Sequence, residues 1–165
     1  MDVTRRRFLI AGNVIALSMI GVSACAGRAA SAPPDSHFAV AHTDAEWRKL
    51  LTPSQYDVLR EAGTEVPYSS PLNDEHRHGV FSCAGCAQGL YSSDTKFDSG
   101  TGWPSFWKPL DHAVVEHADG SLGMSRTEVL CSNCGSHLGH VFDDGPQPTG
   151  LRYCMNGVAM AFRAL

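Results

Sequence analysis

The chain contains six cysteines, and their spacing divides them into three groups that suggest different chemistry. Two pairs, Cys83-x-x-Cys86 and Cys131-x-x-Cys134, have the spacing of zinc ligands. Cys154 stands apart near the C-terminus, and Cys25 lies in the N-terminal segment. If four thiolates bind a metal ion, one thiol of the folded region is left for chemistry. The cysteines therefore favour a cysteine enzyme on a scaffold that zinc stabilises.

The two pairs predict one closed, tetrahedral zinc site per chain, with the ligands Cys83, Cys86, Cys131 and Cys134. Four thiolates leave no position for a reactive water, so this zinc should be structural. Two disulfides or a redox-active C-x-x-C pair remain alternatives. Zinc is favoured because bound thiolates are protected from oxidation.

Cys154 has neighbours that favour a nucleophile over a small buried hydrophobe. Arg152 precedes it by two residues and Asn156 follows it by two, so on a strand all three side chains would point to one face. A guanidinium beside a thiol favours the reactive thiolate. His137 and His140 follow the second cysteine pair closely. They are candidates to donate a proton or orient a substrate oxygen near neutral pH.

Trp103 lies in a glycine-hinged aromatic loop that runs from Gly100 to Trp107. We expect Phe106 of this loop to pack in the core. An indole on a rigid loop is suited to form one wall of a pocket for an apolar group. A substrate with a methyl-bearing sulfur would fit such a wall.

Short elements must position these residues. Capping boxes at Thr43–Glu46 and Thr52–Gln55 predict two short helices, the first extending to Leu51 and the second ending at Gly63. Gly, Pro, Asn, Asp and Ser then separate runs that are typical of strands, and Asp119-Gly120 has the composition of a hairpin turn. The expected strands are 79–83, 113–117, 126–130, 140–142, 151–155 and 158–162. The expected fold class is mainly β and antiparallel, with short N-terminal helices and a zinc knuckle pair.

The N-terminus resembles an export signal. A twin-arginine run at Arg5-Arg6-Arg7 precedes an apolar stretch that ends near Ala24. A transmembrane anchor is the alternative, but the stretch is slightly short and contains polar residues. The run Val22–Cys25 resembles a lipobox, in which Cys25 would carry a lipid that attaches the protein to the membrane; the same region also fits ordinary cleavage. We expect a signal at 1–26, a flexible tether at 27–37 and localisation in the periplasm or cell envelope.

The remaining residues, 38–165, have the length of one domain with one modest core, in which a metal would add useful stability. The full chain of 165 residues has a net charge of −4. Removal of residues 1–24 takes away three arginines and one aspartate, which leaves a charge near −6. An acidic domain has no electrostatic reason to bind nucleic acid.

Four motifs together make the chain similar to a known family. They are Gly102–Phe106, Cys131–Phe142, Asp144–Pro146 and Pro148–Asn156. From about Asp44 to Phe162 the chain resembles the B-type methionine sulfoxide reductases, which reduce methionine-R-sulfoxide. The resemblance implies two small antiparallel sheets, with zinc on the side away from the active site. We expect a monomer that acts on methionine-R-sulfoxide in oxidised proteins, with free methionine sulfoxide as an alternative substrate.

The resemblance also implies roles for individual residues. Cys154 is the nucleophile, and Trp103 and Phe142 bind the substrate. The polar residues near the sulfoxide or the nucleophile are His137, His140, Asn156 and Arg152. The implied reaction is attack of the Cys154 thiolate on the sulfoxide sulfur. A proton reaches the departing oxygen from a group such as His140 or a water that it holds, and Cys154 becomes a sulfenic acid.

Two positions depart from the family pattern. Thr101 stands where many members carry a second, resolving cysteine, and Gly157 stands where serine is frequent. Without a resolving thiol, an external reductant such as a thioredoxin-like protein must regenerate Cys154. Two other functions compete: a non-enzymatic zinc-ribbon binding module, which leaves the Cys154 region unexplained, and a thiol-disulfide oxidoreductase.

Overall fold

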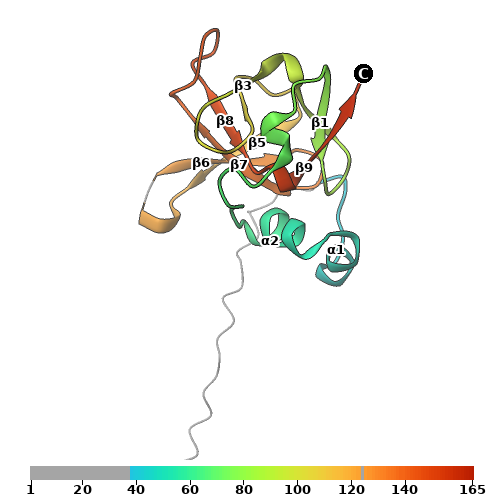
Figure 1. Ribbon diagram of the computed structural model, residues 1–165. Helices are drawn as coiled ribbons and strands as arrows, with labels where there is room; N and C mark the ends of the chain where they lie inside the picture. The colour runs from blue at the N-terminus through green and yellow to red at the C-terminus, as the bar shows by residue number, and fades with distance from the viewer. Residues whose placement is uncertain (1–37, 124) are drawn as a thin grey trace, which may run out of the picture. The chain divides into compact units, whose positions relative to one another are not determined.

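The computed structural model describes residues 38–123 and 125–165 of the chain (Figure 1). The predicted signal at 1–26, with Cys25, and the predicted tether at 27–37 lie outside these residues. Within the described ranges, no helix is both long and apolar enough to span a membrane.

Two helices begin the described part of the chain, α1 (Asp44–Leu50) and α2 (Pro53–Glu61). Both predicted capping boxes are confirmed, because Glu46 and Gln55 accept hydrogen bonds from the main-chain N–H groups of Thr43 and Thr52. The second helix ends differently from the prediction. Its left-handed residue is Ala62, with φ 55°, rather than Gly63. At Gly63, a Cβ atom would meet the exposed Asp57 carboxylate, which would have to move.

The described residues form nine strands in two antiparallel sheets, which confirms the mainly β fold class. The three-stranded sheet has the order β2 (Gly89–Ser92), β1 (Gly79–Cys83) and β9 (Met160–Ala164). The six-stranded sheet has the order β3 (Lys96–Phe97), β4 (Ser105–Phe106), β8 (Arg152–Met155), β7 (His137–Phe142), β6 (Arg126–Cys131) and β5 (Val114–Asp119). Within residues 38–123 and 125–165, short 3-10 turns connect these elements: η1 (Pro71–Asp74), η2 (Ser93–Thr95), η3 (Ser121–Gly123) and η4 (Gly157–Ala159).

All six predicted strands are present with shifts of a few residues at their ends, whereas β2, β3 and β4 were not predicted. Two of the missed strands, β3 and β4, contain only two residues each, which is too short for an alternating pattern to be visible. The chain does reverse between β5 and β6 after Asp119, but the connection includes η3 and is longer than a two-residue turn.

Aromatic rings from both sheets form the centre of the core. Phe106 of β4 stacks on Tyr91 of β2, with ring centroids 4.3 Å apart, and meets the edge of Phe81 of β1 at 4.9 Å. Tyr153 of β8 packs 5.9 Å from Tyr91. Burial of such large rings is a major source of stability. Because Tyr153 points into this core, its neighbour Cys154 must point to the other face of the sheet.

Candidate active site and metal centre

Cys154 lies on β8, between β4 and β7. The register places Cys154 directly opposite Ser105 of β4 and His140 of β7. Directly opposed residues of an antiparallel pair point to the same face, with Cβ atoms about 4.5–5.5 Å apart. Arg152 and Cys154 are partly exposed, whereas Tyr153 and Met155 are buried. The predicted shared face of Arg152 and Cys154 is therefore confirmed.

A chain of hydroxyl groups leads away from Cys154. The Thr101 Oγ1 atom lies 3.8 Å from the Cys154 Sγ atom and 2.8 Å from Ser99 Oγ. Ser99 Oγ lies 2.7 Å from Ser105 Oγ, which donates to the Trp103 carbonyl at 3.1 Å. The residue that departs from the family pattern, Thr101, is thus in direct contact with the nucleophile candidate.

The environment of Cys154 favours the neutral thiol at rest. Burial raises the pKa of the Cys154 thiol, and the hydrogen bond to Thr101 and the charge of Arg152 oppose this rise without cancelling it. As predicted, Arg152 lowers the pKa of Cys154, but its guanidinium also binds other groups. It forms two hydrogen bonds of 2.8 Å with the Asp144 carboxylate, and its guanidinium lies 4.4 Å above the Phe142 ring. Phe142 is therefore part of the same face as Cys154, opposite Arg152 in the register.

His140 is held by a carboxylate that the sequence did not reveal. Its Nε2 atom lies 2.9 Å from Asp119 Oδ2, and Arg126 bonds to the same oxygen at 2.7 Å. Hydrogen bonds from Ser121, His140 and Arg126 hold the pKa of Asp119 well below its usual range. Burial lowers the pKa of His140, so this imidazole is neutral near pH 7 and donates its Nε2 proton to Asp119.

His137 has a different partner and a free nitrogen. Its Nδ1 atom lies 2.6 Å from Glu128 Oε1, and its side chain is only 4% exposed. Among the described residues, nothing accepts from or donates to the buried Nε2 atom. The His137 and His140 rings lie 5.4 Å apart. With Nδ1 donating to Glu128, Nε2 carries a proton for a substrate oxygen only when the ring is cationic.

Asn156 and Trp103 are both tied to Glu65, which sequence reasoning missed. Because β8 ends at Met155, the alternation that places Arg152 and Cys154 on one face does not extend to Asn156. The Asn156 amide is buried, accepts from the Glu65 N–H at 3.0 Å and donates to the Leu138 carbonyl at 3.1 Å. The Trp103 indole donates to the Glu65 carbonyl at 3.1 Å.

The four predicted zinc ligands come together in space. Their Sγ atoms all lie within 4.8 Å of one another, with 3.7 Å between Cys83 and Cys134 and 3.6 Å between Cys86 and Cys131. Tetrahedral zinc with Zn–S bonds of about 2.3 Å requires S–S separations of about 3.8 Å. These distances fit a shared metal ion, and all four cysteines are free rather than paired in disulfides. Since Cys83 ends β1 and Cys131 ends β6, the cluster joins the two sheets.

A thiol on a sheet face beside two carboxylate-bound imidazoles is the arrangement of a thiol enzyme, and the separate four-cysteine cluster is consistent with a structural metal site. Residues 51–164 match the model of the SelR domain, and the chain therefore belongs to this family. A relative from Agrobacterium fabrum is 56% identical over 121 residues, which cover 73% of this chain and 90% of the relative. One from Leifsonia xyli is 56% identical over 128 residues, covering 76% and 92%. A third, from Methanosarcina mazei, is 54% identical over 121 residues, covering 73% and 86%. All three bear the name peptide methionine sulfoxide reductase MsrB.

The structure explains why this chain has glycine at position 157. A Cβ atom there would collide with the hydroxyl group of the buried Ser70 and would lie 3.3 Å from Glu65 Oε1. Ser70 and Gly157 therefore form a complementary pair, because the Ser70 side chain occupies the space that a side chain at position 157 would need.

We predict that Gly157→Ser lowers the free energy of unfolding by about 1–3 kcal/mol because it overpacks this space. The double variant Ser70→Gly, Gly157→Ser should recover most of the loss, as measured by urea denaturation. Equal destabilisation of the single and double variants would contradict the pairing.

Proposed function

We propose that this protein reduces methionine-R-sulfoxide in oxidised proteins to methionine, with Cys154 as the nucleophile. The observation that carries the proposal is the position of Cys154 opposite His140 on one sheet face, in a chain 56% identical to a protein named as a methionine sulfoxide reductase. A zinc-ribbon binding module needs only the cysteine cluster. It gives no reason for a thiol, two imidazoles and their carboxylate partners to share a face.

The reaction transfers one oxygen atom. Attack of Cys154 Sγ on the sulfoxide sulfur forms a sulfur–sulfur bond, and the sulfoxide oxygen accepts the thiol proton. The oxygen then passes to Sγ as the substrate sulfur–oxygen bond and the new sulfur–sulfur bond break, which leaves the Cys154 sulfenic acid. Methionine leaves. When the His137 ring is protonated, its Nε2 atom donates a hydrogen bond to the substrate oxygen, and the His140 ring lies 5.4 Å from it on the same polar side of the site. Trp103 receives the methyl group of the substrate, and Phe142 with Arg152 borders the thiol.

Regeneration requires a thiol from outside the described residues. Thr101, 3.8 Å from the nucleophile, has no sulfur to attack the sulfenic acid, and the four clustered cysteines are committed to the metal. One external thiol displaces water from the sulfenic acid to form a mixed disulfide. A second thiol releases Cys154 and leaves an oxidised disulfide product. A thioredoxin-like dithiol protein can supply both.

The first test is activity with separated R- and S-sulfoxides and dithiothreitol as the reductant. We expect reduction of the R form, and a loss of about a thousandfold or more in kcat/KM for Cys154→Ser, since the nucleophile carries the chemical step. Without a reductant, one methionine per protein molecule should form, and dimedone should label Cys154. A folded, metal-loaded protein that leaves the R-sulfoxide intact would sink the proposal.

We further propose that the four-cysteine cluster binds one structural zinc ion. Cys86→Ser should remove the zinc and lower the melting temperature steeply, because structural zinc contributes on the order of 10 kcal/mol in small domains. Elemental analysis and thermal denaturation measure both effects, and Cys154→Ser is the matched control that keeps them unchanged. Full zinc content and a normal melting temperature in Cys86→Ser would refute the structural role.

We also propose that the protein is exported by the twin-arginine signal and works in the cell envelope, where Cys25 is either lipidated or removed. Mass spectrometry of the protein recovered from cells should show a chain without residues 1–24. Replacing Arg5 and Arg6 by lysine keeps the charge and should abolish processing. Recovery of the intact 165-residue chain from the cytoplasmic fraction would contradict this proposal.

A further inference from the structure

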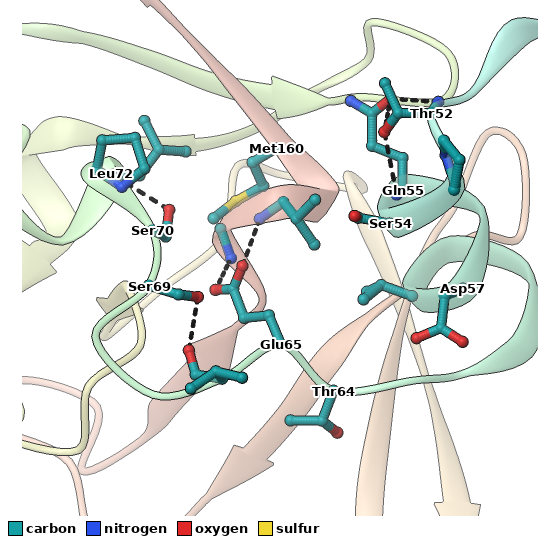
Figure 2. A pocket seen from close by; sticks show the side chains of 16 residues that line it. Thr52, Ser54, Gln55, Asp57, Thr64, Glu65, Ser69, Ser70, Leu72 and Met160 are labelled. Atoms are coloured by element: carbon teal, nitrogen blue, oxygen red, sulfur yellow. Dashed lines mark hydrogen bonds between the residues drawn. The ribbon is translucent and has the colours of Figure 1, made fainter.

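We propose that Glu65 is a positioning residue that holds Trp103 and Asn156 in place beside Cys154. The inference rests on the proposed function and assigns a role to a residue outside the sequence motifs. Glu65 is half-buried in the segment that follows α2, and its side chain forms one wall of an open groove between α2 and η4 (Figure 2). Both its side chain and its main chain bond to residues of the site.

The Glu65 carboxylate fixes the chain directly after the catalytic strand. Its two oxygens accept the main-chain N–H groups of Gly157, at 2.5 Å, and Val158, at 2.9 Å, as the dashed lines in Figure 2 show. These N–H groups begin η4, where the unpaired donors of a helical turn favour a negative charge. Gly157 is only three residues from Cys154. The carboxylate therefore limits movement of the end of β8.

The main chain of Glu65 forms hydrogen bonds with Asn156 and Trp103. Its N–H donates to Asn156 Oδ1 at 3.0 Å, and its carbonyl accepts from the Trp103 indole at 3.1 Å. The other side of the Asn156 amide bonds to Leu138 on β7. One residue thus joins the indole loop, the end of β8 and β7, across sequence separations of 38 and 91 residues.

The chemistry of the contact requires a carboxylate. Two N–H donors need two acceptor oxygens, and a glutamine offers only one oxygen because its NH₂ group would face an N–H. An alanine leaves both donors without the carboxylate and frees the segment that carries the carbonyl bound by Trp103. A loosened indole would no longer hold the substrate methyl group in a fixed position, and loss of orientation is costly for reactions of bound groups.

The experiment compares Glu65→Ala and Glu65→Gln with Glu61→Ala as the matched control. Glu61 is an exposed glutamate of α2 whose carboxylate meets Arg48 at 3.7 Å, away from the site residues. We measure KM and kcat for a methionine-R-sulfoxide peptide, the alkylation rate of Cys154, and the indole N–H resonances of the three tryptophans. The variant Trp103→Phe assigns the resonance of Trp103.

For Glu65→Ala we expect a KM about tenfold higher, a shifted and faster-exchanging Trp103 indole N–H, and a Cys154 alkylation rate within about twofold of the parent. Glu65→Gln should be intermediate in KM and in the indole shift, and Glu61→Ala should match the parent. A lower melting temperature with unchanged KM and an unchanged Trp103 resonance would show a merely structural role and overturn the inference.

Glu65→Gln keeps the test decisive if Glu65→Ala does not fold. In that case a Gln variant with the parental indole resonance and KM would overturn the proposal. Failure of the parent protein to reduce the R-sulfoxide refutes the proposed function alone, because the Trp103 resonance still reports whether Glu65 holds the indole.

Discussion

The register of β8 between β4 and β7 is the constraint on which the site depends. Because side chains alternate along a strand, a slip of one residue would turn Cys154 into the core and expose Tyr153. The core prevents that slip, since Tyr91 donates to the Met155 sulfur at 3.1 Å and Tyr153 donates to Glu116 at 2.8 Å. Gly139 contributes in another way. A Cβ atom there would collide with the Cys154 carbonyl, so only glycine lets β7 approach this closely. The aromatic core and one glycine thus fix which face carries the thiol.

The register of β8 acts within one sheet, whereas the cysteine cluster links the two sheets to each other. It joins the end of β1 to the end of β6 and the turn that leads into β7. α2 is tied to the same turn, because Arg60 donates to the Cys134 carbonyl at 3.3 Å. A metal held at this point would restrain the start of the strand that carries both His137 and His140. In a domain of this size, with a modest core, such a link stabilises the imidazole pair that a thiol enzyme needs.

Local signals in the sequence were reliable, and long-range ones were hidden. The two capping boxes and the alternation of Arg152 with Tyr153 are decided within a few residues, and both were predicted correctly. The cysteine spacing predicted the cluster because a metal imposes its own geometry. The hydrogen-bond partners of the histidines could not be predicted from the sequence. Asp119, for example, is 21 residues from His140 and comes close to it only through sheet pairing. Glu65 is separated from Gly157 by 92 residues and lies in no motif. Ala62 was missed because its left-handed conformation is set by the tertiary structure and not by its own preference.

The protonation states around Cys154 could not be predicted from the sequence either. They change the expected source of the proton that the substrate oxygen accepts. Arg152 alone favours a resting thiolate, yet burial keeps the pKa of Cys154 raised and that of His140 lowered. The resting site then holds a neutral thiol and a neutral His140, with the negative charge on Asp119. Conversion of a thiol and a sulfoxide into a sulfenic acid and a thioether consumes no net proton. The hydrogen needed by the departing oxygen is therefore already present on Cys154, and the imidazoles need only to move it. A neutral thiol also resists adventitious oxidation, which is an advantage for a lone cysteine that has no resolving partner at Thr101.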